Sequence, residues 1–262
     1  MNMNLSIVIP VYNSSKIIKT LVSKIEKKLK KKIKFEIILI NDNSKDDSWD
    51  IIKQISKKKL FVKGVNLSKN HGQHKAIYTG LKFARGDVIV TMDDDMQHPP
   101  EYVFEIYKKV LNNDICYTNY LKRKHIFWKR TVSYVNNLFA SLLFNKPLNV
   151  YMSSFRGFKK KISKKILKKK SDVVFLDSML LRESKTITKI DVIHKKRLKG
   201  ESTYKLKELF SLWFDMIKNF HFLPFRFGSI IGLVSKIIIM IIEKLFNRNE
   251  TDSKVGIKEK TF

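Results

Sequence analysis

The stretch "VIVTMDDDMQHPPE" at residues 88–101 joins a short apolar run to three consecutive carboxylates and a Pro-Pro pair. An apolar run bounded by turn residues is typical of a buried strand, which we expect over residues 87–93. Side chains alternate between the faces of a strand, so Asp93 and Asp95 should point one way and Asp94 the other. Such a D-x-D pair can hold Mg²⁺ or Mn²⁺ together with substrate phosphates, because Mg²⁺ commonly takes only one or two carboxylates. By itself the pair is weak evidence, since acidic strand ends are common and mostly solvated.

The sequence before this stretch alternates between strand and helix patterns. Strands are expected over residues 5–12, 35–42 and 60–67, and helices over residues 14–29, 46–58 and 72–85. Repeats of this length predict βαβ units, and therefore an α/β fold with a mostly parallel central sheet flanked by helices. Ligands of such sheets bind beyond the carboxyl ends of the strands. That rule selects three segments, "PVYN" at 10–13, "NDNS" at 41–44 and "DDDMQ" at 93–97.

These segments share a pattern with a known family. The matching residues are Pro10, Tyr12, Asn13, Asp42, Ser44, Asn70, Gly72, Gly86, Asp87, Asp93, Asp95 and Gln97. In this order and spacing they resemble the motifs of the family 2 glycosyltransferases, which have a GT-A fold and use nucleotide-sugar donors. One departure is Asn41, where the family often has Asp.

The resemblance implies a set of donor-binding residues. They are Pro10, Tyr12, Asn13, Asp42, Asn70, Gly72, Asp93, Asp95 and Gln97. Asp42 would accept a hydrogen bond from the nucleobase, and the loop at 10–13 would hold the nucleoside. Asp93 would lie near the ribose and diphosphate, and Asp95, with Asp93 as a second ligand, would bind the metal ion. The alternative for Asp42 is a local Asx turn within "NDNS".

The second half carries a further set of short motifs. The matching residues are Phe155, Arg156, Arg197, Gly200, Ser202, Tyr204, Pro224 and Arg226. In this order they are similar to the motifs of the branch that transfers sugars to polyprenyl phosphates, such as the dolichol-phosphate mannose synthases. The resemblance implies an acceptor-phosphate site at Arg156, Arg197, Ser202 and Tyr204. Arginine suits such a site because it binds phosphate bidentately. The alternative for both arginines is ion pairing at the protein surface.

The general base is the least determined part of the site. Several polyprenyl-phosphate enzymes have an acid immediately before the Phe-Arg pair, whereas this chain has Ser154 before Phe155. Asp177 is the next candidate for a catalytic base, and the alternative is that it caps the helix that follows it. A phosphate acceptor needs no base, because a phosphate monoester has a second pKa near 6 and is already anionic at neutral pH. A sugar hydroxyl acceptor would need one.

The chain is strongly basic, with 53 Lys and Arg against 24 Asp and Glu and a net charge of +29. Nucleic acid, an anionic membrane surface and a phosphorylated substrate all suit that charge. Runs such as "KKLKKK" at 27–32 are also compatible with plain solvated helix faces. No base-stacking motif or recognition-helix pattern supports a nucleic-acid partner. The single cysteine, Cys116, suits a reducing compartment, and the N-terminus has no signal-peptide pattern, so we expect the cytoplasmic side.

Three regions are expected along the chain: a GT-A domain at 1–220, a membrane-associating apolar or amphipathic helix at 221–246, and a disordered polar tail at 247–262. The apolar region includes Lys236 and has only 16 residues between flanking breaks at 227 and 242, so an in-plane anchor fits better than a spanning helix. The alternative is a core helix.

The sequence as a whole predicts a metal-dependent, inverting glycosyltransferase at the cytoplasmic face of the membrane, with a polyprenyl phosphate as acceptor. Transfer to a saccharide hydroxyl, with Asp177 as base, is the alternative enzyme reaction. The non-enzyme alternative is a basic nucleic-acid-binding α/β protein. A metal site built from His71, His74 and His98 is disfavoured, because the three show no fixed ligand spacing. The sugar, the nucleotide and the oligomeric state are not indicated.

Overall fold

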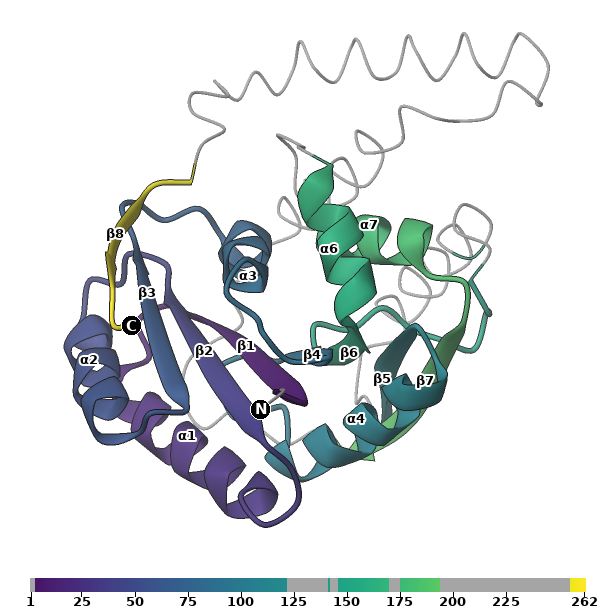
Figure 1. Cartoon of the computed structure of the whole chain (residues 1–262), viewed down its shortest axis with the longest axis horizontal. Coiled ribbons are helices and arrows are strands. Elements are labelled where there is room, and N and C mark those ends of the chain that lie inside the picture. Colours follow the sequence, from purple (N-terminus) through teal and green to yellow (C-terminus); the bar gives the residue numbers. More distant parts are fainter. Residues whose placement is uncertain (1–2, 122–140, 142–145, 170–174, 194–254) are drawn as a thin grey trace, which may run out of the picture. The chain divides into compact units, whose positions relative to one another are not determined.

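The N-terminal half forms strand–helix units whose strands lie parallel at the centre of an eight-stranded sheet in a computed structural model (Figure 1). The structure describes residues 3–121, 141, 146–169, 175–193 and 255–262. They belong to a unit that comprises residues 1–201 and 255–262. The elements of this half are β1 (Leu5–Val11), α1 (Ser15–Leu29), β2 (Phe35–Asn41), α2 (Ser48–Lys58), β3 (Val62–Leu67), α3 (Gln73–Leu81) and β4 (Val88–Thr91).

The predicted strands and helices of this half are confirmed to within a few residues, but β4 is shorter than expected. It pairs with β1 as far as Thr91 opposite Val8 and then ends. The three acids lie beyond it in a bent loop, where Met96 takes a left-handed φ of 66°. The expectation that Asp93 and Asp95 share one strand face is therefore wrong, because strand alternation does not extend to them.

The second half adds antiparallel pairing. Its elements are the 3₁₀ turn η1 (Pro100–Tyr102), α4 (Val103–Asn112), β5 (Ile115–Leu121), β6 (Arg156–Lys159), α6 (Lys160–Lys168), α7 (Leu176–Glu183), β7 (Ile187–Ile193) and β8 (Ile257–Lys260). The strand order is β7-β5-β6-β4-β1-β2-β3-β8, with β6 antiparallel to both β4 and β5. The sheet is mixed, and the parallel pairs are β1 with β2 and β4, β2 with β3, and β5 with β7.

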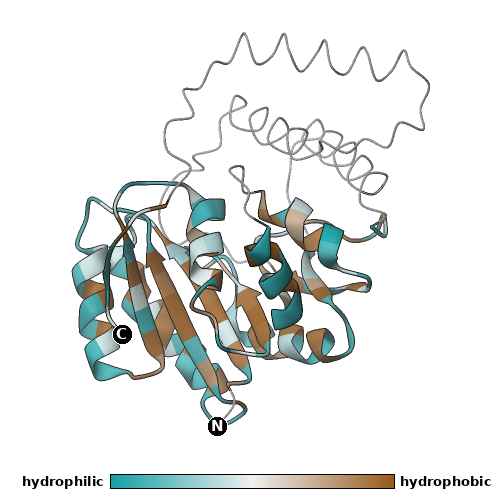
Figure 2. Cartoon of the chain, turned by 45° about the horizontal axis from the view of Figure 1, so that its top comes forward, coloured by the Kyte–Doolittle hydropathy of each residue, from teal (hydrophilic) through white to brown (hydrophobic). Residues whose placement is uncertain are grey.

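Helices cover both faces of the sheet, as the sequence predicts: α1, α2 and α4 lie along one side, and α3, α6 and α7 along the other (Figure 1). Strands β1, β2 and β4 are largely apolar, and the helices carry both polar and apolar residues (Figure 2). On α1 the buried residues Ile18, Leu21, Val22, Ile25 and Leu29 recur at the spacing of one helix face. A Cβ on Gly86 would lie 2.4 Å from the Ser6 backbone nitrogen, so only glycine allows this close approach of the turn before β4 to β1.

The C-terminal residues do not follow the prediction. Residues 247–262 were expected to be disordered, but Ile257–Lys260 form β8, which pairs antiparallel with β3. Trp49 Nε1 donates to Glu259 at 2.7 Å, and the Gly64 N–H donates to Thr261 Oγ1 at 2.7 Å. The prediction is wrong for this segment, because an edge strand needs only one partner and its exposed side chains stay polar. The expected helix at 221–246 lies outside the described residues. Within the described part of the chain, no helix is both long and apolar enough to cross a bilayer.

Candidate active site

The loops that follow β1 and β2 are hydrogen bonded to each other. Asn13 has a left-handed φ of 53°, its N–H donates to Ser44 Oγ at 3.0 Å, and its Oδ1 accepts from the Lys45 N–H at 2.9 Å. Asn tolerates this backbone conformation better than most residues. Tyr12, immediately before it, is 46% exposed. The sequence-predicted segments at 10–13 and 41–44 are thus brought together as one rim.

Asp42 connects this rim to the start of α3. Its carboxylate is buried and accepts hydrogen bonds from the backbone N–H groups of His71 at 2.8 Å and Gly72 at 2.7 Å. Gly72 has a φ of 82°, and its N–H also lies 3.1 Å from Asn70 Oδ1. Burial raises the pKa of Asp42, although the two N–H donors offset part of the shift. The partners of Asp42 lie about thirty residues away, so it holds the loop before α3 rather than its own turn.

Asp94 joins the acidic loop to the first loop. The Tyr12 N–H donates to Asp94 Oδ2 at 3.1 Å. Burial, with smaller contributions from Asp93 and Asp95, raises the pKa of Asp94 to about 6, against the lowering effect of hydrogen bonds from Ser14 and Tyr12. Asp94 stands between the two motif acids, and sequence reasoning missed this role, because the contact joins positions 82 residues apart.

Asp93 is held on three sides. Gln73 Nε2 donates to its Oδ1 at 2.6 Å, and Ser154 Oγ donates to its Oδ2 at 2.9 Å. The Asp93 N–H donates to Nδ1 of the buried His98, whose Nε2 lies 3.7 Å from Oδ2. The His98 ring stacks on Phe155, with centroids 5.0 Å apart and planes 11° apart. Sequence reasoning gave neither Gln73 nor His98 this role; the available signal was their position beside the motif residues Gly72 and Gln97.

Asp95 closes its own turn, since its Oδ1 accepts from the Gln97 N–H at 3.0 Å. No group of three His, Cys, Asp or Glu side chains able to hold a metal occurs among the described residues. A cation here would therefore take a minority of its ligands from the protein and the rest from phosphate and water, as Mg²⁺ commonly does.

Two predicted acceptor-side residues, Arg156 and Asp177, form an ion pair inside the domain. Arg156 is 1% exposed and its Nη1 donates to Asp177 Oδ1, which also accepts from Tyr117 OH at 3.0 Å. The surface ion pair considered for Arg156 is thus a buried one. Helix α7 begins at Leu176 with Phe175 as its N-cap residue, so the alternative of Asp177 as the N-cap is wrong. Arg197, Ser202 and Tyr204 lie outside the described residues.

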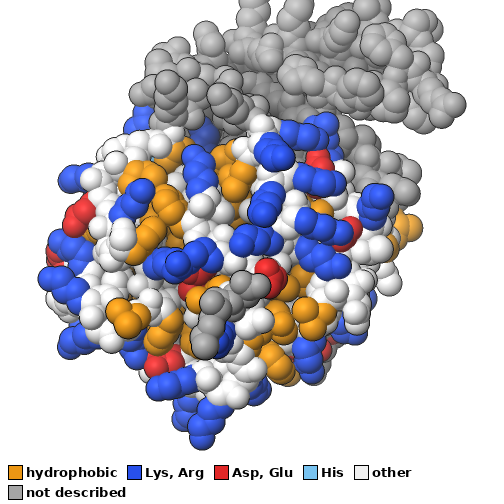
Figure 3. Space-filling model, in the orientation of Figure 1, with side chains coloured by type: hydrophobic (Ala, Val, Ile, Leu, Met, Phe, Trp, Pro, Cys, Tyr) orange, Lys and Arg blue, Asp and Glu red, His pale blue; other side chains and the backbone are white. Residues whose placement is uncertain are grey.

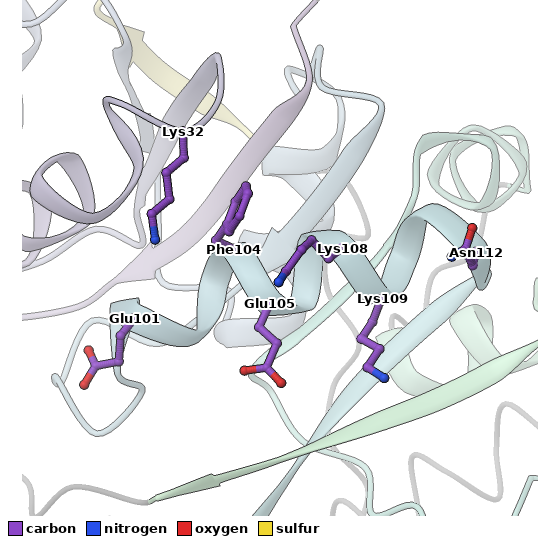
Figure 4. Close-up of a pocket in the computed structure, with 7 residues that line it drawn as sticks. All are labelled: Lys32, Glu101, Phe104, Glu105, Lys108, Lys109 and Asn112. Atoms are coloured by element: carbon purple, nitrogen blue, oxygen red, sulfur yellow. The ribbon is translucent and has the colours of Figure 1, made fainter.

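A shallow groove on α4 has no part in these contacts. Figure 4 shows its lining residues, Lys32, Glu101, Phe104, Glu105, Lys108, Lys109 and Asn112. Lys32 and Lys108 lie over the Phe104 ring, at 5.1 and 5.6 Å from its centroid. None of the donor-loop residues lines the groove, and its mixed charges do not favour a phosphate.

The part of the chain that contains the loops beyond β1, β2 and β4 matches a known family. The family model described as "Glycosyl transferase family 2" covers residues 6–167. The chain belongs to glycosyl transferase family 2. The predicted enzyme class is confirmed.

Curated members of the family resemble this glycosyltransferase along most of its length. It is 32% identical over 231 residues to the undecaprenyl-phosphate 4-deoxy-4-formamido-L-arabinose transferase of Pseudomonas syringae pv. syringae. The aligned region covers 87% of this chain and 68% of the relative. The Serratia proteamaculans protein of the same name is 29% identical over 232 residues, covering 87% of this chain and 71% of the relative.

Solved structures confirm the GT-A fold of this family 2 glycosyltransferase. Staphylococcus aureus TarS 1–349, in complex with UDP-GlcNAc, aligns with a TM-score of 0.57 at 17% identity, covering 84% of this chain and 67% of TarS. Glucosyl-3-phosphoglycerate synthase of Mycobacterium tuberculosis, in complex with Mn²⁺, UDP and glucosyl-3-phosphoglycerate, aligns with a TM-score of 0.57 at 15% identity, covering 82% of this chain and 79% of the synthase.

The donor set of this family 2 enzyme fits a hard divalent cation. Carboxylate oxygens are the ligands that Mg²⁺ and Mn²⁺ take in proteins. Both oxygens of Asp93 already accept hydrogen bonds, from Gln73 and Ser154. Asp95 Oδ1 accepts a hydrogen bond from the Gln97 backbone N–H of its own turn. Asp93 and Asp95 are the carboxylates that would hold such a cation.

Proposed function

We propose that this glycosyltransferase moves a sugar from a nucleoside-diphosphate donor to a polyprenyl phosphate of the undecaprenyl type. The carrying observation is that four carboxylates, Asp42, Asp93, Asp94 and Asp95, lie just beyond the carboxyl ends of β2 and β4, where such folds bind nucleotides, and that Asp42 and Asp93 both contact residues at the start of α3. The acceptor is supported by the Pseudomonas and Serratia relatives, whose names specify undecaprenyl phosphate and which match 87% of the chain.

In this proposal each donor-side residue has one task. The rim of Tyr12, Asn13 and Asp42 holds the nucleoside, and Asp93 orients the sugar-proximal part of the donor. Asp95 would hold a divalent cation, Mg²⁺ or Mn²⁺, which would supply positive charge that stabilises the departing nucleoside diphosphate. Gln97 and the loop at 70–72 complete the site. The acceptor oxygen attacks the anomeric carbon opposite the leaving group, so the anomeric configuration inverts.

The arrangement around Asp177 favours a phosphate acceptor over a sugar hydroxyl. Asp177 is buried and accepts from Arg156 and Tyr117, so taking a proton from a hydroxyl would break up a buried ion pair. A phosphate monoester is already an anion at neutral pH and needs no such base. Arg197, Ser202 and Tyr204 are the residues proposed to bind its phosphate.

We also propose that the face formed by α3 and α6 contacts the anionic cytoplasmic leaflet. Lys and Arg side chains dominate this face (Figure 3), and neither helix contains an acidic residue. Its lysines are Lys75, Lys82, Lys160, Lys161, Lys164, Lys165, Lys168 and Lys169. Lys161 forms an ion pair with Asp114, and Lys165 and Lys169 with Glu183, whereas Lys164 and Lys168 are exposed. Each basic residue near an anionic leaflet contributes about 1 kcal/mol of attraction.

The membrane face can be tested with charge-matched variants. Lys164→Glu with Lys168→Glu reverses two exposed lysines four residues apart on α6, and Lys24→Glu with Lys28→Glu does the same on α1. Both variants have the same net charge. Binding to vesicles containing phosphatidylglycerol should weaken at least tenfold more for the α6 variant. Equal weakening would show that only total charge matters and would contradict this surface.

The donor and acceptor are tested in two steps. Thermal stabilisation by UDP-, GDP- and dTDP-sugars with Mn²⁺ or Mg²⁺ identifies the nucleotide. Radiolabelled sugar from that donor should then appear in an organic-extractable product when undecaprenyl phosphate is added, and acid treatment should release it. Stabilisation by no nucleotide sugar under any metal condition would contradict the enzyme. Transfer to a saccharide but not to the lipid phosphate would contradict the acceptor.

A further inference from the structure

A short turn before β6 carries the serine that contacts Asp93. Thr91 Oγ1 donates to the Ser154 carbonyl oxygen at 2.7 Å, and Thr118 Oγ1 donates to the Phe155 carbonyl oxygen at 2.7 Å. Ser153 Oγ lies 3.0 Å from Tyr120 OH. Residues of β4 and β5, the two strands that flank β6, therefore fix the backbone of this turn, so the direction of the Ser154 hydroxyl depends on where the turn sits.

The buried ion pair supplies a further support of this turn. Arg156 Nη1 donates to the Ser153 carbonyl oxygen at 3.1 Å as well as to Asp177. The three partners come from three elements: Tyr117 from β5, Arg156 from β6 and Asp177 from α7. The guanidinium also lies over the Tyr117 ring, 6.0 Å from its centroid. The ion pair thus joins helix α7 to the carbonyl group that precedes Ser154.

The burial of Arg156 and Asp177 separates them from the acceptor. Both are among the buried charged residues of the domain, at 1% and 7% exposure. A charge this deeply buried is stable only while its partner remains. Arg156 Nε has no hydrogen-bond partner among the described residues, but it is buried, so a lipid phosphate could contact the guanidinium only by entering the interior of the domain.

We infer that Arg156 and Asp177 are positioning residues that aim the Ser154 hydroxyl at Asp93, rather than groups that touch the acceptor. Loss of the ion pair removes one support of the turn, and Asp93 then loses one of the two groups that hydrogen bond to its carboxylate. The effect therefore falls on donor binding. This inference rests on the proposed function, because it assigns Asp93 to the donor.

The test compares the Kd for the nucleotide and the KM for the acceptor in three variants. Ser154→Ala removes the hydroxyl itself, Asp177→Asn removes the charge that holds Arg156, and Tyr117→Phe removes one hydrogen bond while keeping the ion pair. We expect the Kd for nucleoside diphosphate with Mn²⁺ to rise about tenfold in the first two and about threefold in Tyr117→Phe. The KM for the acceptor should stay within twofold, and the pH profile of kcat should keep its shape.

Coupling between the sites gives the most direct evidence. If Asp177 acts through Ser154, the double variant Ser154→Ala with Asp177→Asn should bind the nucleotide no more than twofold worse than either single variant, whereas independent effects would multiply. Asp191→Asn, on an exposed residue of β7, makes the same change of charge and should leave the Kd unchanged.

Several results would overturn the inference. One is a kcat lowered at least a hundredfold by Asp177→Asn with unchanged nucleotide affinity and a lost acidic limb of the pH profile, as a general base requires. Multiplied effects in the double variant would also overturn it. If Asp177→Asn does not fold, an unchanged Kd in both Tyr117→Phe and Ser154→Ala overturns it. The nucleotide measurements need no acceptor, so they stand even if the lipid acceptor is wrong, and a wild-type protein that binds no nucleotide would instead contradict the proposed function.

Discussion

Replacing Asp94 with Asn should stabilise the folded protein by an amount that depends on pH. Burial raises the pKa of Asp94 from 3.8 to about 6, with the charges of Asp93 and Asp95 adding to the effect. An acid with a raised pKa binds its proton more tightly in the folded state. Its contribution to stability is therefore complete below pH 3.8 and is lost as the pH rises through 6.

The magnitude follows from the shift. A difference of roughly 2 pKa units at about 1.36 kcal/mol per unit gives a penalty of roughly 3 kcal/mol above pH 6. Asn carries no charge and keeps an oxygen that can accept from the Tyr12 N–H, which Asp94 now does at 3.1 Å. The variant should then exceed the wild type in free energy of unfolding by roughly 3 kcal/mol at pH 8 and by about half of that at pH 5.

Urea denaturation at several pH values between 5 and 8, without divalent cations, measures this difference. Asp50→Asn, at an exposed position on α2, is the control and should show no comparable rise with pH. A stability difference that is absent, or that does not change with pH, would refute the reasoning that burial penalises the Asp94 charge.

Three further predictions concern separate contacts. Asp95→Asn should weaken nucleotide binding with Mn²⁺ at least tenfold and leave nucleotide binding without metal unchanged, both measured by calorimetry. An equal loss of affinity with and without Mn²⁺ would contradict the assignment of Asp95 to the metal site. Ser154→Asp places a carboxylate where a hydroxyl now lies 2.9 Å from Asp93, and the two carboxylates repel each other. Donor affinity should therefore fall about tenfold at pH 8 and recover towards pH 6. A pH-independent donor affinity would contradict this. Thr261→Val removes the acceptor of the Gly64 N–H and should lower the free energy of unfolding by about 1 kcal/mol in urea denaturation; unchanged stability would mean that β8 adds little.

The sequence predicted the strands and helices of the N-terminal half well, because buried parallel strands appear in a sequence as continuous apolar runs. The second half carried no such signal. Strand β6 reads "RGFK", and its place between β4 and β5 is decided by tertiary pairing rather than by its own composition. Strand β8 reads "IKEK", and its four residues are all exposed, so its pairing with β3 could not be read from apolar periodicity.

The same distinction holds within the site. Asp42, Asp93 and Asp95 were found because each follows a strand in a motif with fixed spacing. The groups that orient the acidic loop were not found, because Gln73 and Ser154 reach Asp93, and the Tyr12 N–H reaches Asp94, from distant positions. Motif reasoning thus identifies which carboxylates gather at the sheet edge, and only the fold determines what each one contacts.

The three adjacent acids repel one another, and each is held in the loop by different hydrogen-bond donors. Asp93 is held by the neutral donors Gln73 and Ser154, and Asp95 by a backbone N–H of its own turn. All three side chains are half-buried, and desolvation together with repulsion from its two neighbours raises the pKa of Asp94. A cation bound beside the three acids favours their charged forms and so removes part of the penalty. Metal and donor binding should therefore stabilise the fold more at pH 8 than at pH 5, and Asp94→Asn should reduce that difference. The acid that touches neither metal nor donor would then couple folding stability to occupation of the site.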